Sequence, residues 1–244
     1  MSDEPKVVPR VYILDTETTA HFEAQPKPEV IELAYAAIEG GALIDHFEQR
    51  YKPVSMPMTL GAMAVHHILP EELLDCPPSN EAKIPDDAAY IVGHNIDFDW
   101  KALGQPNVRR VCTLAMARML WDDEDSHSLG ACLYRVKPHD EARKMLQGSH
   151  SAAVDVENTF EILKALIKLA VSKNHVLANW GAIYAFSENA RLPRRWTFGK
   201  YRGRPIGKEF GDKADFGYHS WCDRQVDMDP YLKKALYAFK NGKL

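Results

Sequence analysis

The fold of this chain is decided by the stretch Val11-Tyr12-Ile13-Leu14-Asp15-Thr16-Glu17-Thr18-Thr19. Four apolar residues end at an acid, Asp15, and a second acid, Glu17, follows two positions later. The apolar run predicts a short buried strand. Side chains alternate across a strand, so both carboxylates are expected on one face, where they repel each other unless a cation lies between them. The stretch is therefore either a solvated acidic strand end or part of a metal site.

Length and composition indicate a globular protein. The 244 residues suit one large domain, with or without a small appendage, and a hydrophobic content of 45% is enough for a core. No run of about 18 apolar residues occurs, so no membrane segment is expected. The N-terminus is polar and acidic, unlike a signal peptide. The four cysteines are scattered, without a C-x-x-C pair, which favours reduced thiols in a cytoplasmic protein.

The charge of the chain is distributed unevenly. Residues 1–190 hold 17 Lys and Arg against 28 Asp and Glu, a net charge of −11. Residues 191–244 hold 13 against 6, a net charge of +7. The basic segment is either an ordinary solvated face or a nucleic-acid contact, and its interleaved aromatic residues favour the second interpretation. The candidate contacts are Arg195, Lys200 and Arg202, which alternate with Trp196, Phe198 and Tyr201.

The order of the expected elements predicts an α/β fold. Strands at 30–38 and 43–51 follow the first strand as a meander, and strands at 88–92 and 110–113 alternate with helices. Such an order indicates a mixed sheet with helices on both faces. A long helix after residue 151 has one apolar stripe, and a hairpin is expected at 196–203, followed by helices near 216–224 and 230–240.

Two further acids are expected beside the first pair. Asp99 lies shortly past the strand at 88–92, beside His94 and Asn95. Asp155 lies in the first turns of the long helix, and His150 precedes it by five residues. Ser149 or Ser151 is a good helix cap, so His150 is expected in the loop before the helix, free to swing toward Asp155. Four carboxylates and one histidine can thus meet at one edge of the sheet.

Several other side chains have both a structural and a functional interpretation. His94 and Asn95 either close a loop by hydrogen bonding or contact the substrate. His66 has the same two alternatives, whereas Glu32 is expected to be a hydrogen-bonded structural acid. Phe22 is either core or a wedge against a terminal base. Thr16 and Thr18, on the strand that carries the first two acids, are further candidate substrate contacts.

Three ordered motifs resemble the DEDDh superfamily of exonucleases. They are Asp15-Thr16-Glu17, His94-Asn95-x-x-Phe98-Asp99 and His150-x-Ala152-x-x-Asp155. Residues 60–68 resemble the segment in which that superfamily carries a substrate-facing histidine, here His66. The sequence Phe198-Gly199-Lys200-Tyr201-Arg202-Gly203 is similar to the C-terminal signature of its exodeoxyribonuclease X branch.

This resemblance implies an RNase H-like exonuclease fold, with a mixed five-stranded sheet flanked by helices and a small basic C-terminal module. The implied boundaries are 1–172 for the exonuclease domain, 173–193 for a helical connector and 194–244 for the module. It also implies a 3′–5′ exonuclease that releases nucleoside 5′-monophosphates from single-stranded DNA or duplex 3′ ends, in replication or repair. A 3′–5′ exoribonuclease and a non-catalytic nucleic-acid-binding protein are the alternatives, and a homodimer or other protein partner is left open.

The implied chemistry matches the residue types. Hydrolysis of a phosphodiester brings hydroxide to an anion, and two Mg²⁺ ions can promote it, with Mn²⁺ as a substitute. Mg²⁺ prefers hard oxygen ligands, so the implied metal ligands are Asp15, Glu17, Asp99 and Asp155. Histidine titrates near neutral pH, which makes His150 the expected general base.

Overall fold

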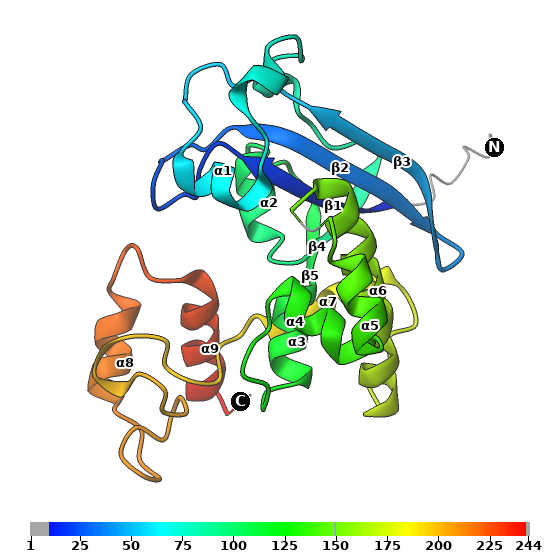
Figure 1. Cartoon of the computed structure of the whole chain (residues 1–244). Helices are drawn as coiled ribbons and strands as arrows, with labels where there is room; N and C mark the ends of the chain where they lie inside the picture. The colour runs from blue at the N-terminus through cyan, green and yellow to red at the C-terminus, as the bar shows by residue number, and fades with distance from the viewer. Residues whose placement is uncertain (1–9, 149, 243–244) are drawn as a thin grey trace, which may run out of the picture. The chain divides into compact units, whose positions relative to one another are not determined.

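The computed structural model describes residues 10–148 and 150–242 (Figure 1). The chain divides into two compact units, Met1–Ser187 and Glu188–Leu244, and each has its own core. No helix within the described residues is long and apolar enough to cross a membrane. The four cysteines are all free, as expected for reduced thiols, and three of them are buried.

The first unit is built on a five-stranded mixed sheet of order β3-β2-β1-β4-β5. Its strands are β1 (Arg10–Thr18), β2 (Val30–Glu39), β3 (Ala42–Arg50), β4 (Ala88–Gly93) and β5 (Arg109–Cys112). The first three strands pair antiparallel, whereas β4 pairs parallel with both β1 and β5. This arrangement confirms the α/β fold with a mixed five-stranded sheet. The β2–β3 turn uses Gly40 and Gly41, whose φ angles of 58° and 81° suit glycine.

Helices surround this sheet (Figure 1). Within the described residues, the α-helices of this unit are α1 (Leu60–His66), α2 (Asp97–Ala102), α3 (Thr113–Leu120), α4 (Leu129–Val136), α5 (His139–Met145) and α6 (Ala152–Ser172), and α7 (Trp180–Ala190) crosses the boundary between the units. Short 3₁₀ turns lie at η1 (Pro70–Leu73) and η2 (Ser79–Glu81). Helix α5 has no counterpart among the elements expected from the sequence.

The alternation of side chains along β1 directs its residues to two different helices. Leu14 packs in a cluster with Ile96 and Trp100, at α2. Asp15 and Glu17 point to the opposite face of the strand, because they differ from Leu14 by an odd number of positions. Helix α6 packs against β1 and β2, and its first turn carries Asp155. The end of β1 therefore lies between the helices that carry the other two acids.

The C-terminal unit contains α8 (Phe216–Asp223), α9 (Pro230–Lys240) and the 3₁₀ turn η3 (Gly199–Tyr201). Trp196 and Tyr201, which alternate with the basic candidates, are 1% and 4% exposed and belong to the core of this unit. The expected hairpin at 196–203 forms no β-strands. It is a loop closed by hydrogen bonds between the backbones of Trp196 and Arg204 and of Gly203 and Trp196.

Candidate active site

One pocket brings together all four acids and the histidine that the sequence selects. Its lining also includes the aromatic and amide side chains of the second motif. The lining residues are Asp15, Thr16, Glu17, His94, Asn95, Phe98, Asp99, Leu129, His150 and Asp155. They come from β1, the β4–α2 junction, the start of α4 and the start of α6.

Asp99 is fixed by hydrogen bonds from the central residue of the first motif. The backbone N–H and the hydroxyl of Thr16 donate to Asp99 Oδ1 over 3.0 and 2.8 Å. Asp99 is 4% exposed and lies in the first turn of α2. Because Thr16 lies between the two acids of β1, these bonds place Asp99 next to Asp15 and Glu17. Thr16 is thus committed to positioning an acid, and a substrate contact by its side chain stays a prediction.

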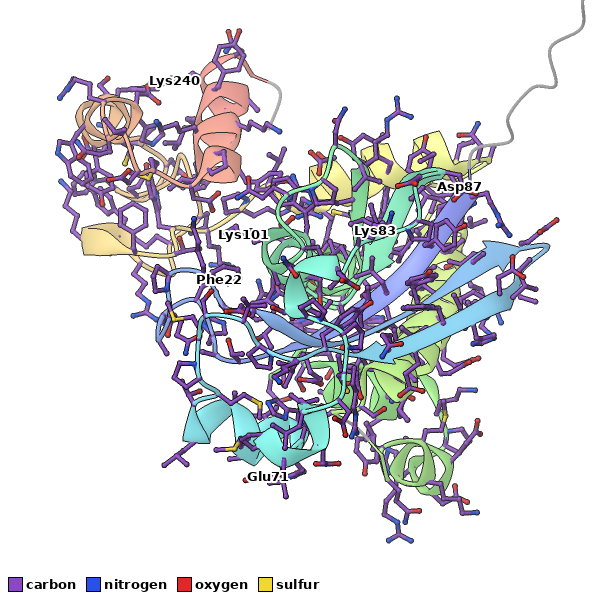
Figure 2. All side chains as sticks on the ribbon, turned by 90° about the horizontal axis from the view of Figure 1, so that it is seen from above. Phe22, Glu71, Lys83, Asp87, Lys101 and Lys240 are labelled. Atoms are coloured by element: carbon purple, nitrogen blue, oxygen red, sulfur yellow. The ribbon has the colours of Figure 1, made fainter. Side chains whose placement is uncertain are left out.

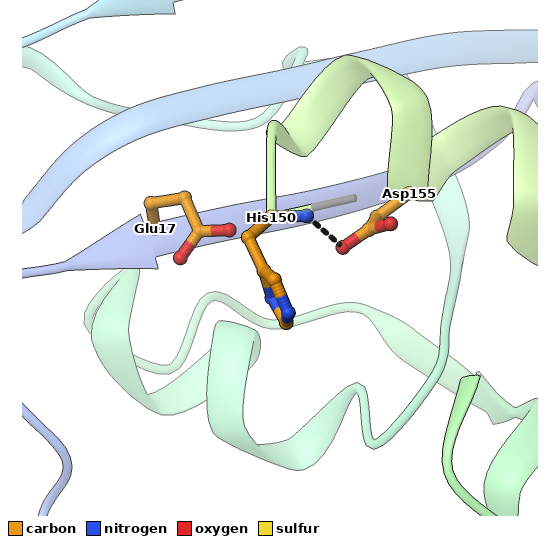
Figure 3. A group of neighbouring side chains, drawn as sticks. All are labelled: Glu17, His150 and Asp155. Carbon is orange, nitrogen blue, oxygen red and sulfur yellow. Dashed lines mark hydrogen bonds between the residues drawn. The ribbon is translucent and has the colours of Figure 1, made fainter. Parts of the chain in front are cut away.

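Asp155 and His150 lie on either side of the start of α6 (Figure 3). His150 precedes the helix in a turn, with φ of 69°, and its side chain is exposed. Its backbone N–H donates to Asp155 Oδ2 over 3.3 Å. Glu17, His150 and Asp155 each offer a ligand atom, and the three atoms lie within 4.8 Å of one another. The other carboxylate oxygen of Asp155 is buried, and within residues 10–148 and 150–242 no donor makes a hydrogen bond of normal geometry to it.

The site accumulates negative charge that protons or cations must balance. Burial and the neighbouring carboxylates raise the pKa of Asp15 far above its usual range. The same two causes raise the pKa of Glu17 to about 8. Burial raises the pKa of Asp99 to about 7 against the hydrogen bonds from Thr16, and burial also raises the pKa of Asp155. Hard oxygen donors, crowded charge and the buried Asp155 oxygen fit a divalent cation.

Glu32 holds the N-terminus of α6 in place. It is 1% exposed and lies opposite Glu17 in the β1–β2 ladder. One carboxylate oxygen accepts from the backbone N–H of Ala152 over 2.9 Å, and the other pairs with Arg50 Nε at 2.9 Å. Ser151, one of the two predicted caps, occupies the N-cap position, but its side chain makes no capping hydrogen bond. Ser149 lies outside the described residues.

His94 and Asn95 form the turn between β4 and α2. His94 Nε2 donates to the carbonyl oxygen of His127 over 2.9 Å, and Nδ1 lies 3.0 Å from the Thr113 hydroxyl. Burial lowers the pKa of His94 to about 4, so this ring is neutral at physiological pH. Asn95 is exposed and adopts φ of 73°, which asparagine tolerates. Both line the pocket, and substrate contact by either stays a prediction.

His66 and Thr18 lie outside the pocket lining. His66 is 6% exposed at the end of α1, and its Nδ1 accepts from the backbone N–H of Ile68 over 3.0 Å. Burial lowers the pKa of the ring, and interaction with the Thr18 backbone opposes that shift. The Thr18 hydroxyl donates to the carbonyl oxygen of Ala20. The assignment of either residue as a substrate contact stays a prediction.

Phe22 lies on the loop between β1 and β2 (Figure 2). Its ring packs edge-on against Phe98, a pocket residue, with 5.3 Å between the centroids. His21 stacks on the same ring, also at 5.3 Å, and was not among the sequence candidates. His21 is adjacent to Phe22 in the loop that follows the first motif, and this pairing of rings is the sequence signal that could have identified His21. Phe98 therefore joins this aromatic loop to the acidic pocket.

The three basic candidates belong to the C-terminal unit. Arg195 donates to the carbonyl oxygen of Gly203 over 3.0 Å, and Lys200 pairs with Asp215 at 3.0 Å. Arg202 is exposed and makes no ion pair with any described residue. Contact between these side chains and a nucleic acid stays a prediction.

Comparison with known proteins decides the family. Residues 12–163 match the family model of the RNase T type, whose description is "Exonuclease", and this segment contains all three motifs. The chain belongs to this exonuclease family. The resemblance drawn from the ordered acids and His150 is therefore confirmed, as is the expectation of an exonuclease. Members of the family depend on divalent metal ions, in agreement with the acidic pocket.

Exonucleases and polymerases are among the relatives of this chain. Exodeoxyribonuclease 10 of Escherichia coli K12 is 26% identical over 229 residues, which span 92% of this chain and 96% of that protein. A PolC-type DNA polymerase III of Lacticaseibacillus paracasei is 28% identical over 69% of this chain but only 12% of its own length.

Solved structures share the fold. Exonuclease X in complex with 5′ overhanging duplex DNA aligns with a TM-score of 0.54 and 24% identity, over 71% of this chain and 99% of that one. Exonuclease I of E. coli in complex with a dA16 oligonucleotide aligns with a TM-score of 0.52 and 16% identity, over 77% of this chain and 44% of that one.

Proposed function

We propose that this exonuclease removes nucleotides from the 3′ end of DNA and releases nucleoside 5′-monophosphates. The observation that carries the proposal is the convergence of Asp15, Glu17, Asp99, Asp155 and His150 on one pocket. Support for DNA as the substrate comes from a relative named exodeoxyribonuclease, matched over nearly its whole length, and from two fold neighbours solved with DNA.

The four acids would hold two Mg²⁺ ions, for which Mn²⁺ could substitute. Once bound, such ions supply a nucleophilic hydroxide at neutral pH and stabilise charge on the leaving oxygen. The acids fit this role because the pKa values of all four are raised in the cation-free pocket. Thr16 holds Asp99 in place, while Glu32 holds the helix that carries Asp155.

His150 is the proposed general base. Its side chain is exposed and adjoins two acids, so it can accept a proton from water and pass it to solvent. The hydrogen bond from its backbone to Asp155 fixes the turn, which leaves the ring free to move. Phe22 is the proposed wedge against the terminal base, and its edge-on contact with the pocket residue Phe98 supports this role.

Matched DNA and RNA oligomers of one sequence test the substrate class. The purified enzyme is incubated with each oligomer in Mg²⁺, and the released nucleotides are separated and quantified. Faster release of deoxynucleoside 5′-monophosphates supports the proposal. Preferential release from RNA would make the exoribonuclease alternative correct, and binding without release from either would favour the non-catalytic one.

A further inference from the structure

Four aromatic rings of the C-terminal unit form a connected row, in the order Phe210, Tyr201, Tyr218, Trp221. The centroids of successive rings are 5.3, 5.1 and 5.4 Å apart. The first two contacts are edge-on, and the third is stacked, with 17° between the planes. The end rings are open to solvent, since Phe210 is 59% and Trp221 42% exposed. The row therefore offers ring surface to a ligand at both ends.

The sequence signature at residues 198–203 builds this row. Gly199 adopts φ of 69°, and a β-carbon there would lie 2.2 Å from the Tyr218 hydroxyl oxygen. Only glycine lets Tyr218 approach this closely without displacing the turn. Lys200 places its ammonium 4.7 Å from the ring centre of Tyr201 and 5.1 Å from that of Tyr218. The signature thus contributes three features: Gly199 allows Tyr218 to approach closely, Tyr201 is one ring of the row, and Lys200 is a cation next to it.

Part-buried hydrogen bonds hold the two central rings of the row, Tyr201 and Tyr218, in place. Asp215 accepts from the Tyr201 hydroxyl over 2.6 Å and from the backbone N–H of Tyr218 over 3.0 Å. Beneath it, Glu209 is fully buried and accepts from the Asp215 backbone N–H over 3.2 Å. A surface held this way loses little conformational entropy when a ligand stacks on it.

The C-terminal segment that contains the row is positively charged, which favours a polyanion as its ligand. Residues 191–244 carry a net charge of +7. Lys200 is partly neutralised by Asp215, but Arg202 and Arg224 are exposed and make no ion pair within residues 10–148 and 150–242. Arg202 follows Tyr201 directly, and Arg224 lies three residues after Trp221. Exposed rings, with exposed arginines close to them in the sequence, match unpaired bases and their phosphates.

We propose that the row Phe210-Tyr201-Tyr218-Trp221 is a stacking platform for single-stranded DNA, separate from the residues that carry out hydrolysis. Bases stack on Phe210 and Trp221, while Arg202 and Arg224 contact phosphates. This inference rests on the proposed function only for the choice of DNA over other polyanions. In this proposal the ring surface comes from the exposed Phe210 and Trp221, while Trp196 is buried.

Binding of a fluorescent thymidine oligomer of about 20 nucleotides, measured by anisotropy on the full chain with EDTA present, tests the platform without cleavage. We expect Trp221→Ala and Phe210→Ala each to weaken binding by about 5- to 100-fold, the usual effect of losing one stacked base. Trp221→Phe should recover most of the affinity. Tyr237→Ala is the matched control, because this ring is 67% exposed in the same unit and, among the described residues, makes no ring contact with the row.

Cleavage of a dinucleotide and the melting temperature are measured on the same variants. Unchanged values of both, together with weaker binding of the long oligomer, support the platform. Binding that matches the Tyr237→Ala control overturns it. A lower melting temperature with equal loss on short and long substrates also overturns it, since the rings would then serve packing. A wild-type protein that binds the oligomer but does not cleave it refutes the proposed function alone.

Discussion

The carboxylate of Glu32 accepts a hydrogen bond from the backbone N–H of Ala152, 120 residues away in the sequence. Glu32→Ala should remove this anchor, lower stability by about 1–3 kcal/mol and reduce activity, because α6 carries Asp155 and follows His150. Glu32→Gln keeps an acceptor for Ala152 and should retain more of both. Thermal melting and turnover at saturating Mg²⁺ check the expectation.

Glu72→Gln is the control for this pair of variants. Glu72 pairs with Arg50 Nη1 at 2.9 Å and is exposed, and none of its hydrogen bonds to described residues reaches α6. Its loss should therefore leave turnover unchanged. If the Glu32 and Glu72 substitutions changed turnover equally, activity would depend on the ion pairs with Arg50 and not on the anchor of α6.

Each of the four acids should be required for activity. Replacement of Asp15, Glu17, Asp99 or Asp155 by alanine is expected to abolish most turnover while the protein stays folded. The Glu17→Gln variant should also melt at a higher temperature than the wild type in EDTA at pH 8, because it removes one of the repelling charges. Circular dichroism and nucleotide release measure both effects. Near-normal turnover of any variant would remove that residue from the ligand set.

The metal-free protein should lose stability as pH rises from about 6.5 to 8.5. The pKa of Glu17 is raised to about 8 and that of Asp99 to about 7, so the folded state binds more protons than the unfolded state in this range. Their contribution to stability is complete only below the ordinary carboxyl pKa, and it is lost progressively as pH rises through the folded pKa values of about 7 for Asp99 and about 8 for Glu17. Below about pH 6.5 the lowered pKa of His94 acts in the opposite direction.

Melting curves in EDTA across this window check the sign, and the slope should be smaller in Glu17→Gln. Added Mg²⁺ should stabilise the protein more at pH 8 than at pH 6.5, because bound cations replace the protons. A melting temperature that rises with pH in EDTA would contradict the assignment of crowded, protonated acids.

His150→Ala should lower the rate by about 10²–10⁴, the usual contribution of a general base. Divalent metal binding should survive, since the proposed ligands are the four acids. Calorimetric titration with Mn²⁺ separates the roles, because His150 lies within 4.8 Å of the ligand atoms of Glu17 and Asp155. Loss of Mn²⁺ affinity in this variant would show that the histidine is a ligand.

Local patterns were enough to predict the sheet and the convergence of the acids. The alternation along β1 placed Asp15 and Glu17 on one face, and the chain order placed Asp99 beside them. The sequence could not reveal that Glu32 caps α6, because that bond joins residues 120 positions apart and the nearby Ser151 is the better cap by residue type.

The C-terminal unit shows the other limit of sequence patterns. A sequence in which aromatic and basic residues alternate does not tell whether the rings lie in the core or on the surface. Only the packing of the unit distinguishes the buried Trp196 from the exposed Trp221. The positive φ of Gly199 and its contact with Tyr218 depend likewise on α8, which comes later in the chain.

The polarity of digestion tests the central claim most directly. A single-stranded DNA oligomer labelled at its 5′ end is incubated with the enzyme and Mg²⁺, with the Asp155→Ala variant as the inactive control. The expected result is a ladder of labelled products that shorten one nucleotide at a time, with unlabelled 5′-monophosphates released, and no reaction in EDTA. Immediate release of the label as a mononucleotide, or undiminished digestion in EDTA, would contradict the account.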